Sequence, residues 1–191
     1  MIASVLTFLR YAAMVITLIL PAFYVAVAIY HHEMLPAKLM ESVIEAKKSV
    51  PFPTAAEVTL MLIAFELLQE AGLRLPNPVG DVVSIIGALV VGQAAVEARV
   101  VSPIVVIIIA VAGISGSAMP SQDMASALRI SRFVLVILSI VGGLFGIVMG
   151  VVMLVWHLST LETFGVPYMT PFAGGDRKKT SRALVRKPLN T

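Results

Sequence analysis

The stretch GLRLPNPVGDVVSIIGALVVGQAAVEARVVS, residues 72–102, decides how the chain is read. It is apolar enough to enter a membrane, yet it carries acidic, amide and hydroxyl side chains. Its small residues recur at every fourth position: Gly80, Ser84, Ala88 and Gly92. A helix with this spacing presents one smooth stripe that another helix can approach closely. We therefore predict a helix over residues 80–98 that meets other helices or lines a polar path.

The polar and apolar residues of this helix predict different roles. Charged and amide side chains are costly in lipid, so they should face protein or water. Three such residues mark the wetter ends of the helix: Asp81, Gln93 and Glu97. Three apolar residues lie between the ends and form a candidate constriction that closes by dewetting: Leu89, Val90 and Val91.

The composition of the whole chain indicates an integral membrane protein. Of its 191 residues, 59% are hydrophobic and 13% are charged, whereas soluble domains average about 45–50% apolar and about 25% charged residues. The chain has no cysteine, which excludes disulfides, thiol catalysis and cysteine-held metals. We expect one membrane domain over residues 1–173 and a basic, unfolded cytoplasmic tail over residues 174–191.

Four apolar segments predict an all-α polytopic membrane protein of about four spanning helices. They are residues 11–30, 80–98, 102–118 and 133–156. Each approaches the length of about 20 residues that crosses the hydrocarbon layer. The third segment is β-branched, but an unpaired strand cannot satisfy its backbone in lipid, so a helix is favoured. An even number of crossings places Arg10 and the basic tail on the same, cytoplasmic side.

Two more segments are expected to form embedded or interfacial helices. Residues 54–71 carry Glu57, Glu66 and Glu70, which make a lipid-facing span unfavourable. This helix is expected to be buried with its acids facing a partner or water, or else to lie at the interface. Residues 37–50 have a modest apolar face and are expected to lie along the membrane surface.

The last span also carries small residues at regular spacing. Residues 133–156, FVLVILSIVGGLFGIVMGVVMLVW, contain no charge. Gly142, Gly146 and Gly150 form two overlapping GxxxG repeats. In an apolar helix these repeats predict a close contact with another helix.

No enzyme motif is found, and no catalytic residue, metal or cofactor is predicted. The sequence His31-His32-Glu33 has metal-binding side chains, but adjacent residues of a helix diverge and no third ligand follows at a fixed spacing. Residues 87–92, GALVVG, do not form a phosphate-binding loop because no strand precedes them. The basic tail indicates topology rather than nucleic-acid binding.

The intramembrane acids leave two interpretations open. They pair across helices and fix the fold, or they attract cations into a water-filled path. The residues by themselves favour these two about equally. A third class, a fragment of a secondary transporter, would predict inverted repeats, and the halves show no self-similarity.

Four runs of the sequence resemble a known family. They are LPAFYVAVAIYHHEMLP, VPFPTAAEVTLM, EAGLRLPNPVGDVVSIIGALVVGQAAVEARVVSP and TFGVPYMTPFA. They resemble the membrane portion of the A subunits of GerA-type spore germination receptors, and equally the related stage V sporulation protein AF. The likeness covers roughly residues 8–173.

The resemblance implies a subunit in the inner membrane of bacterial spores. It implies a transporter-like B subunit that holds the nutrient and a lipoprotein C subunit as partners, besides membrane lipid. It also implies homo-oligomers around an ion pore that opens when the germinant binds, with the pore helix at residues 80–98. Family members carry a large soluble N-terminal region, and this chain begins just before its first span, so we expect a truncated, split or mis-started form. The resemblance favours permeation over a non-conducting scaffold.

Overall fold

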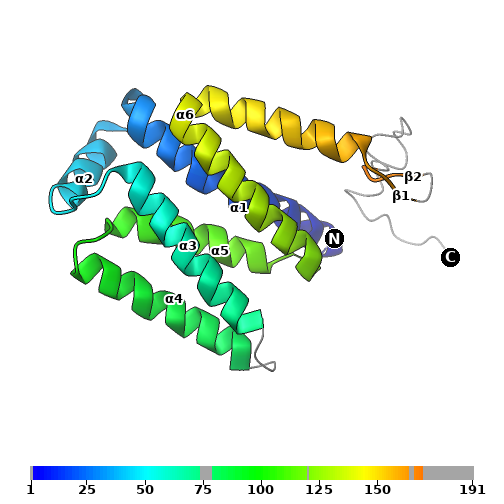
Figure 1. The fold of residues 1–191 in the computed structure, drawn as a ribbon, viewed down its shortest axis with the longest axis horizontal. Coiled ribbons are helices and arrows are strands. Elements are labelled where there is room, and N and C mark those ends of the chain that lie inside the picture. Colours follow the sequence, from blue (N-terminus) through cyan, green and yellow to red (C-terminus); the bar gives the residue numbers. More distant parts are fainter. Residues whose placement is uncertain (1, 74–78, 120, 164–165, 170–191) are drawn as a thin grey trace.

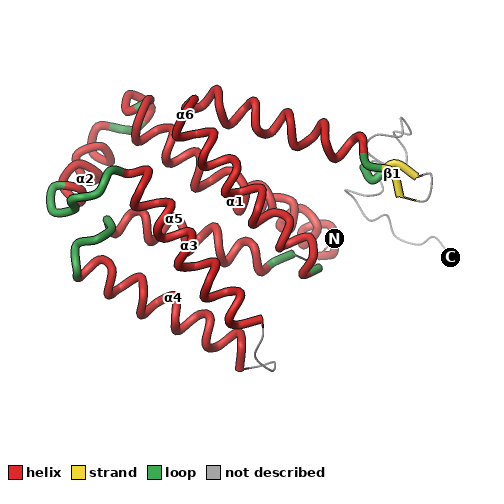
Figure 2. The backbone as a smooth tube through the Cα atoms, viewed as in Figure 1, coloured by secondary structure: helices red, strands yellow, loops and turns green. Residues whose placement is uncertain are grey.

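The structure, a computed structural model, describes residues 2–73, 79–119, 121–163 and 166–169. Nearly all of these residues are helical (Figure 2). The helices are α1 (Ile2–Tyr30), the short 3-10 helix η1 (His32–Met34), α2 (Ala37–Lys47), α3 (Thr54–Leu73), α4 (Val79–Glu97), α5 (Pro103–Ser117) and α6 (Gln122–Thr160). Two strands of two residues each, β1 (Glu162–Thr163) and β2 (Val166–Pro167), form an antiparallel hairpin. The all-α prediction is confirmed, apart from this hairpin.

The apolar helix α5 packs against α1 and α3 (Figure 1). One face of α5 is buried against these helices, whereas Ile107 and Ile114 on its other face are exposed. Its side chains Val105 and Ile109 are fully buried, and Thr17 of α1 donates a hydrogen bond to the Ala112 carbonyl oxygen at 3.1 Å. The β-branched segment is a helix, as expected, and contacts of its buried face hold it against α1 and α3.

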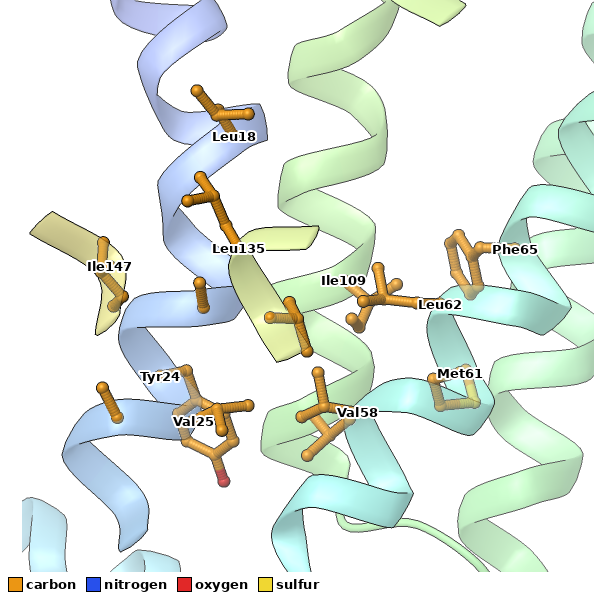
Figure 3. Close-up of a cluster of buried hydrophobic side chains, with 14 of the residues drawn as sticks. Leu18, Tyr24, Val25, Val58, Met61, Leu62, Phe65, Ile109, Leu135 and Ile147 are labelled. Atoms are coloured by element: carbon orange, nitrogen blue, oxygen red, sulfur yellow. The ribbon is translucent and has the colours of Figure 1, made fainter. Parts of the chain in front are cut away.

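The core joins four helices (Figure 3). Val25 of α1, Leu62 of α3, Ile109 of α5 and Leu135 of α6 are all buried in one apolar cluster. Helix α4 lies outside this cluster, at the edge of the bundle, where it packs on α3 (Figure 1). Helix α2 lies at the end of the bundle that is distant from the N-terminus.

Helix α6 is not straight, which differs from the expected single span over residues 133–156. Gly143 has φ 57° and ψ −137°, a backbone conformation that side chains larger than glycine rarely adopt. The helix folds back there into a first arm, residues 122–142, and a second arm, residues 144–160 (Figure 1). Tyr30 packs against this bend and donates a hydrogen bond to the Ile140 carbonyl oxygen at 2.7 Å.

The two arms of α6 touch each other through glycines. A Cβ atom added at Gly146 would lie 2.8 Å from the carbonyl carbon of Leu138. A Cβ atom added at Gly150 would lie 2.8 Å from Leu138 Cδ1. Residues eight or twelve apart are about 12 and 18 Å apart in a straight helix, so these contacts exist only because the helix reverses. Gly142 has nothing within 4 Å of such an atom.

By length and composition, two of the described helices could cross a membrane, Val5–Tyr30 and Asp123–Thr160. The segments Ile86–Glu97 and Pro103–Ser117 are shorter apolar helices. The expected count of four spanning helices therefore remains a prediction. The proposed tail, residues 174–191, lies outside the described residues.

Candidate functional site

Helix α4 is held close to its neighbours by glycines on its inner side. A Cβ atom added at Gly87 would lie 2.9 Å from Leu68 Cδ2 of α3. A Cβ atom added at Gly92 would lie 2.9 Å from Val106 Cγ1 of α5. Small residues thus let the backbone of α4 approach both helices. Of these two, only Gly92 belongs to the small-residue stripe of the sequence.

The remaining residues of the small-residue stripe are placed as follows. Gly80 is buried and Ala88 is half-buried on α4. The side chains of Ser84 and of Asp81 lie outside the described part of the structure, so neither the stripe nor the polar end at Asp81 is seen completely.

The outer side of α4 is exposed along one line. Besides Ala94, its exposed residues between Ile86 and Glu97 recur at intervals of three or four around the adjacent pair Leu89 and Val90: Ile86, Leu89, Val90, Gln93 and Glu97. Such spacing places side chains on one face of a helix. We call this set the outer face of α4. Leu89 is 68% and Val90 is 58% exposed, whereas Val91 is half-buried, so the structure separates Val91 from the other two candidate constriction residues.

The outer face of α4 is apolar in its middle and polar at the end of the helix. Gln93 Nε2 donates a hydrogen bond to Glu97 Oε1 at 3.0 Å. The amide and the carboxylate are both exposed and are one helical turn apart. The outer face thus presents a polar pair next to a band of large apolar side chains.

Glu57, the first of the intramembrane acids, is 1% exposed and lies where α2, α3 and α5 meet. Its Oε2 accepts a 2.8 Å hydrogen bond from the backbone N–H of Ser102, at the start of α5. Its Oε1 lies 3.5 Å from Lys47 Nζ, which also donates to Thr54 Oγ1. A carboxylate at a helix N-terminus satisfies free N–H groups and complements the helix dipole. Glu57 therefore joins three segments of the chain.

Glu66, the second acid, binds two arginines of α6. Its Oε1 lies 3.1 Å from Arg129 Nη1, and its Oε2 lies 3.5 Å from Arg132 Nη2. Arg132 is 1% and Arg129 is 9% exposed. Buried charges require partners, because removal from water is costly. Arg129 and Arg132 are three residues apart and lie on one face of α6, but no local sequence pattern identifies Glu66 as their partner.

Glu70, the third acid, lies on the exposed surface of α3, one turn beyond Glu66. The structure therefore does not bring the three acids to one site. Glu57 and Glu66 instead bind cations of their own chain at two separate places. Among the described residues, no three His, Cys, Asp or Glu side chains are grouped as a metal site requires.

Comparison with known sequences gives the family. The profile of the family described as Bacillus/Clostridium GerA spore germination protein matches residues 1–191. The chain belongs to the GerA family. The resemblance seen over roughly residues 8–173 is thus confirmed, and the match extends over residues 1–191.

Several curated GerA relatives match nearly all of this chain. Spore germination protein KA of Bacillus subtilis (strain 168) is 45% identical over 98% of the chain. The uncharacterized membrane protein YfkQ of the same organism is 43% identical over 98%, and spore germination protein GerLA of Bacillus cereus is 40% identical over 98%. The chain covers only 34% of the first of these relatives, 37% of the second and 38% of the third. No solved structure matches the chain.

Proposed function

We propose that the chain is the membrane part of an A-type subunit of a spore germination receptor. In this proposal, copies of the chain assemble in the inner spore membrane with B-type and C-type subunits and surround an ion path lined by α4. The path opens when the receptor binds its germinant. The observation that carries the proposal is the outer face of α4, which is uncovered at the edge of the bundle.

The chemistry of the outer face supports a role in permeation. The exposed pair Gln93 and Glu97 is unfavourable against lipid and favourable against water. Leu89 and Val90 both lie about one turn from Gln93 and about two turns from Glu97 on the same face. A ring of such large apolar side chains would exclude water from a narrow path. The inner side of α4 is fastened through Gly87 and Gly92. The outer face is therefore held at a defined position relative to the bundle.

The folded α6 changes the proposed count of crossings. If both arms of α6 cross the membrane, these two crossings and those of α1, α4 and α5 make five. An odd number of crossings would place the two ends of the chain on opposite sides of the membrane. Including α3 gives six, an even number that returns the basic tail to the side of Arg10. We therefore propose six passes instead of four. In Figure 1 the successive helices run back and forth along the long axis, as six passes require.

The exposed residue Arg99 distinguishes these two topologies. Six passes place it opposite the N-terminus, whereas four passes place it on the N-terminal side. The chain has no cysteine, so an Arg99→Cys variant carries a single thiol. Labelling by a membrane-impermeant thiol reagent from the cytoplasmic side of inverted vesicles would contradict six passes.

Single cysteines on α4 test the ion path. In a receptor reconstituted with its other subunits, Leu89→Cys and Val90→Cys are expected to lose most of their current after thiol modification. Ile114→Cys, which is 72% exposed on α5, is the matched control and should keep its current. Val90→Ala should widen the constriction and release ions without germinant, and the half-buried Val91→Ala should act less. Unchanged currents in the Leu89 and Val90 variants would contradict the proposal.

A second candidate function is a scaffold subunit that conducts nothing. The observation in its favour is that Glu57 and Glu66 are neutralised by Lys47, Arg129 and Arg132 of the same chain. Such pairs fix a fold, and they leave Glu57 and Glu66 without an unbalanced charge to attract ions. Single-channel recording from the purified oligomer separates the two functions, because a scaffold gives no current under any condition.

A further inference from the structure

A cleft of about 320 Å³ lies at the end of the bundle opposite the N-terminus, between α2 and the end of α1. Its apolar lining includes Met40, Val43 and Ile44, which lie on one face of α2. Its basic side chains are His32, Lys47 and Lys48. The volume is at the small end of the range for ligand sites, about 300–1,000 Å³. The cleft thus combines an apolar lining with a basic rim.

We propose that this cleft binds the headgroup and upper acyl chain of an anionic phospholipid. The phosphate would lie at Lys47 and Lys48, and the hydrocarbon would cover the apolar face of α2. Basic pockets between membrane helices bind anionic headgroups. In the proposed topology this cleft lies on the side of the membrane opposite Arg10. The proposal rests on the membrane placement given above, but not on ion conduction.

The charges around the cleft match an anionic ligand. Lys47 already lies 3.5 Å from Glu57, so its charge is partly balanced. Lys48 is exposed and makes no ion pair with any described residue. No acidic side chain lines the cleft, and Glu41 and Glu45 are exposed elsewhere on α2. A monoanionic phosphodiester would supply the missing negative charge.

The apolar lining argues for a lipid over a soluble anion. Contact with Met40, Val43 and Ile44 gives inorganic phosphate no binding free energy. An acyl chain would gain binding free energy there, because it covers the apolar surface of these side chains. Ile44 is 48% exposed although it faces the cleft, so it remains available for such a contact. The amphipathic helix α2 would then lie at the interface with a lipid seated beneath it.

The test is a lipid titration of the full chain in detergent, followed by native mass spectrometry. Dioleoyl phosphatidylglycerol is expected to bind more tightly than dioleoyl phosphatidylcholine. Lys48→Gln should weaken phosphatidylglycerol binding about fivefold, the effect of one basic charge near a membrane surface. Lys38→Gln removes the same charge near the start of α2, outside the cleft, and should change nothing.

Three outcomes would overturn the site. The first is equal binding of the two lipids, and the second is an equal effect of Lys48→Gln and Lys38→Gln. The third is displacement of phosphatidylglycerol by inorganic phosphate at equal concentration, which would indicate a site for a free anion. Val43→Trp should fill the cleft and weaken phosphatidylglycerol binding; unchanged binding would also contradict the site. Recovery of folded chain in water without detergent would contradict the membrane placement itself, so the two failures are distinguishable.

Discussion

The carboxylate of Glu57 accepts a 2.8 Å hydrogen bond from the backbone N–H of Ser102, 45 residues further along the chain. Because Glu57 also pairs with Lys47, one buried side chain connects α2, α3 and the start of α5. Tyr24 Oη and Ser102 Oγ are also buried at this end of the bundle. Glu57 satisfies the buried backbone N–H of Ser102 there.

Replacing Glu57 is expected to destabilise the bundle. Glu57→Ala should lower the free energy of unfolding by about 3 kcal/mol, because it leaves Lys47 and the Ser102 N–H without their partner. Glu57→Gln keeps an acceptor for Ser102 and should cost less. Unfolding by sodium dodecyl sulfate in mixed micelles measures the difference. The exposed Glu97→Ala is the control, with an effect within about 0.5 kcal/mol.

The contact between Glu66 and Arg132 should show energetic coupling. Glu66→Gln leaves two buried guanidinium groups without a counter-charge and should destabilise by about 3 kcal/mol. Arg132→Met by itself should also destabilise, because it removes the contact of Arg132 with Glu66 and its packing. The loss should be partial, because Glu66 keeps Arg129 as a partner. The double variant should be more stable than the sum of both losses predicts, with coupling of about 1–3 kcal/mol. Additive effects in the same denaturation assay would contradict the contact.

The fold of α6 depends on Gly146. Gly146→Leu should separate the two arms, because even a Cβ atom there would lie 2.8 Å from the carbonyl carbon of Leu138. Gly142→Leu is the matched control, since nothing lies within 4 Å of its added atom.

The separation of the arms can be measured with nitroxide labels at Val134 and Val152, both exposed. In the folded helix their distance should be well below the about 27 Å of a straight helix. Gly146→Leu should lengthen the distance and Gly142→Leu should not. A straight-helix distance in the unmodified protein would contradict the bend at Gly143.

Arg99 holds a strained position that glycine should relieve. It is in the left-handed region with φ 57°, where the Val100 N–H binds the Ala95 carbonyl oxygen at 2.9 Å and the Arg99 N–H binds that of Val96 at 2.9 Å. This pattern is a Schellman C-cap, in which glycine is preferred. Arg99→Gly should stabilise by about 0.5–1 kcal/mol in the denaturation assay. Arg99→Ala keeps the strain, so an equal gain there would assign the effect to charge.

Local sequence signals predicted the helices well. The β-branched segment before Gly113 was predicted to be a helix because the composition of the chain indicated an apolar environment, and it is a helix. The helix α2 was predicted from its apolar face, which contains Met40 and Val43. Its place along the membrane surface stays a prediction. The bend of α6 was not predicted, because Gly142 and Gly143 in an apolar run fit both a straight helix and a reversal. Only the packing of Tyr30 and the contacts of Gly146 distinguish them.

The sequence by itself determined the apolar character of the chain, the positions of the helices and the residues that are costly to bury. These properties depend on composition and on the periodicity of neighbouring residues, which act locally. The tertiary structure decided which charges meet, which face of α4 stays uncovered and where α6 reverses. Glu66 meets Arg129 and Arg132 across more than sixty residues of chain. No local pattern encodes such a partner, because it arises only when the helices pack side by side.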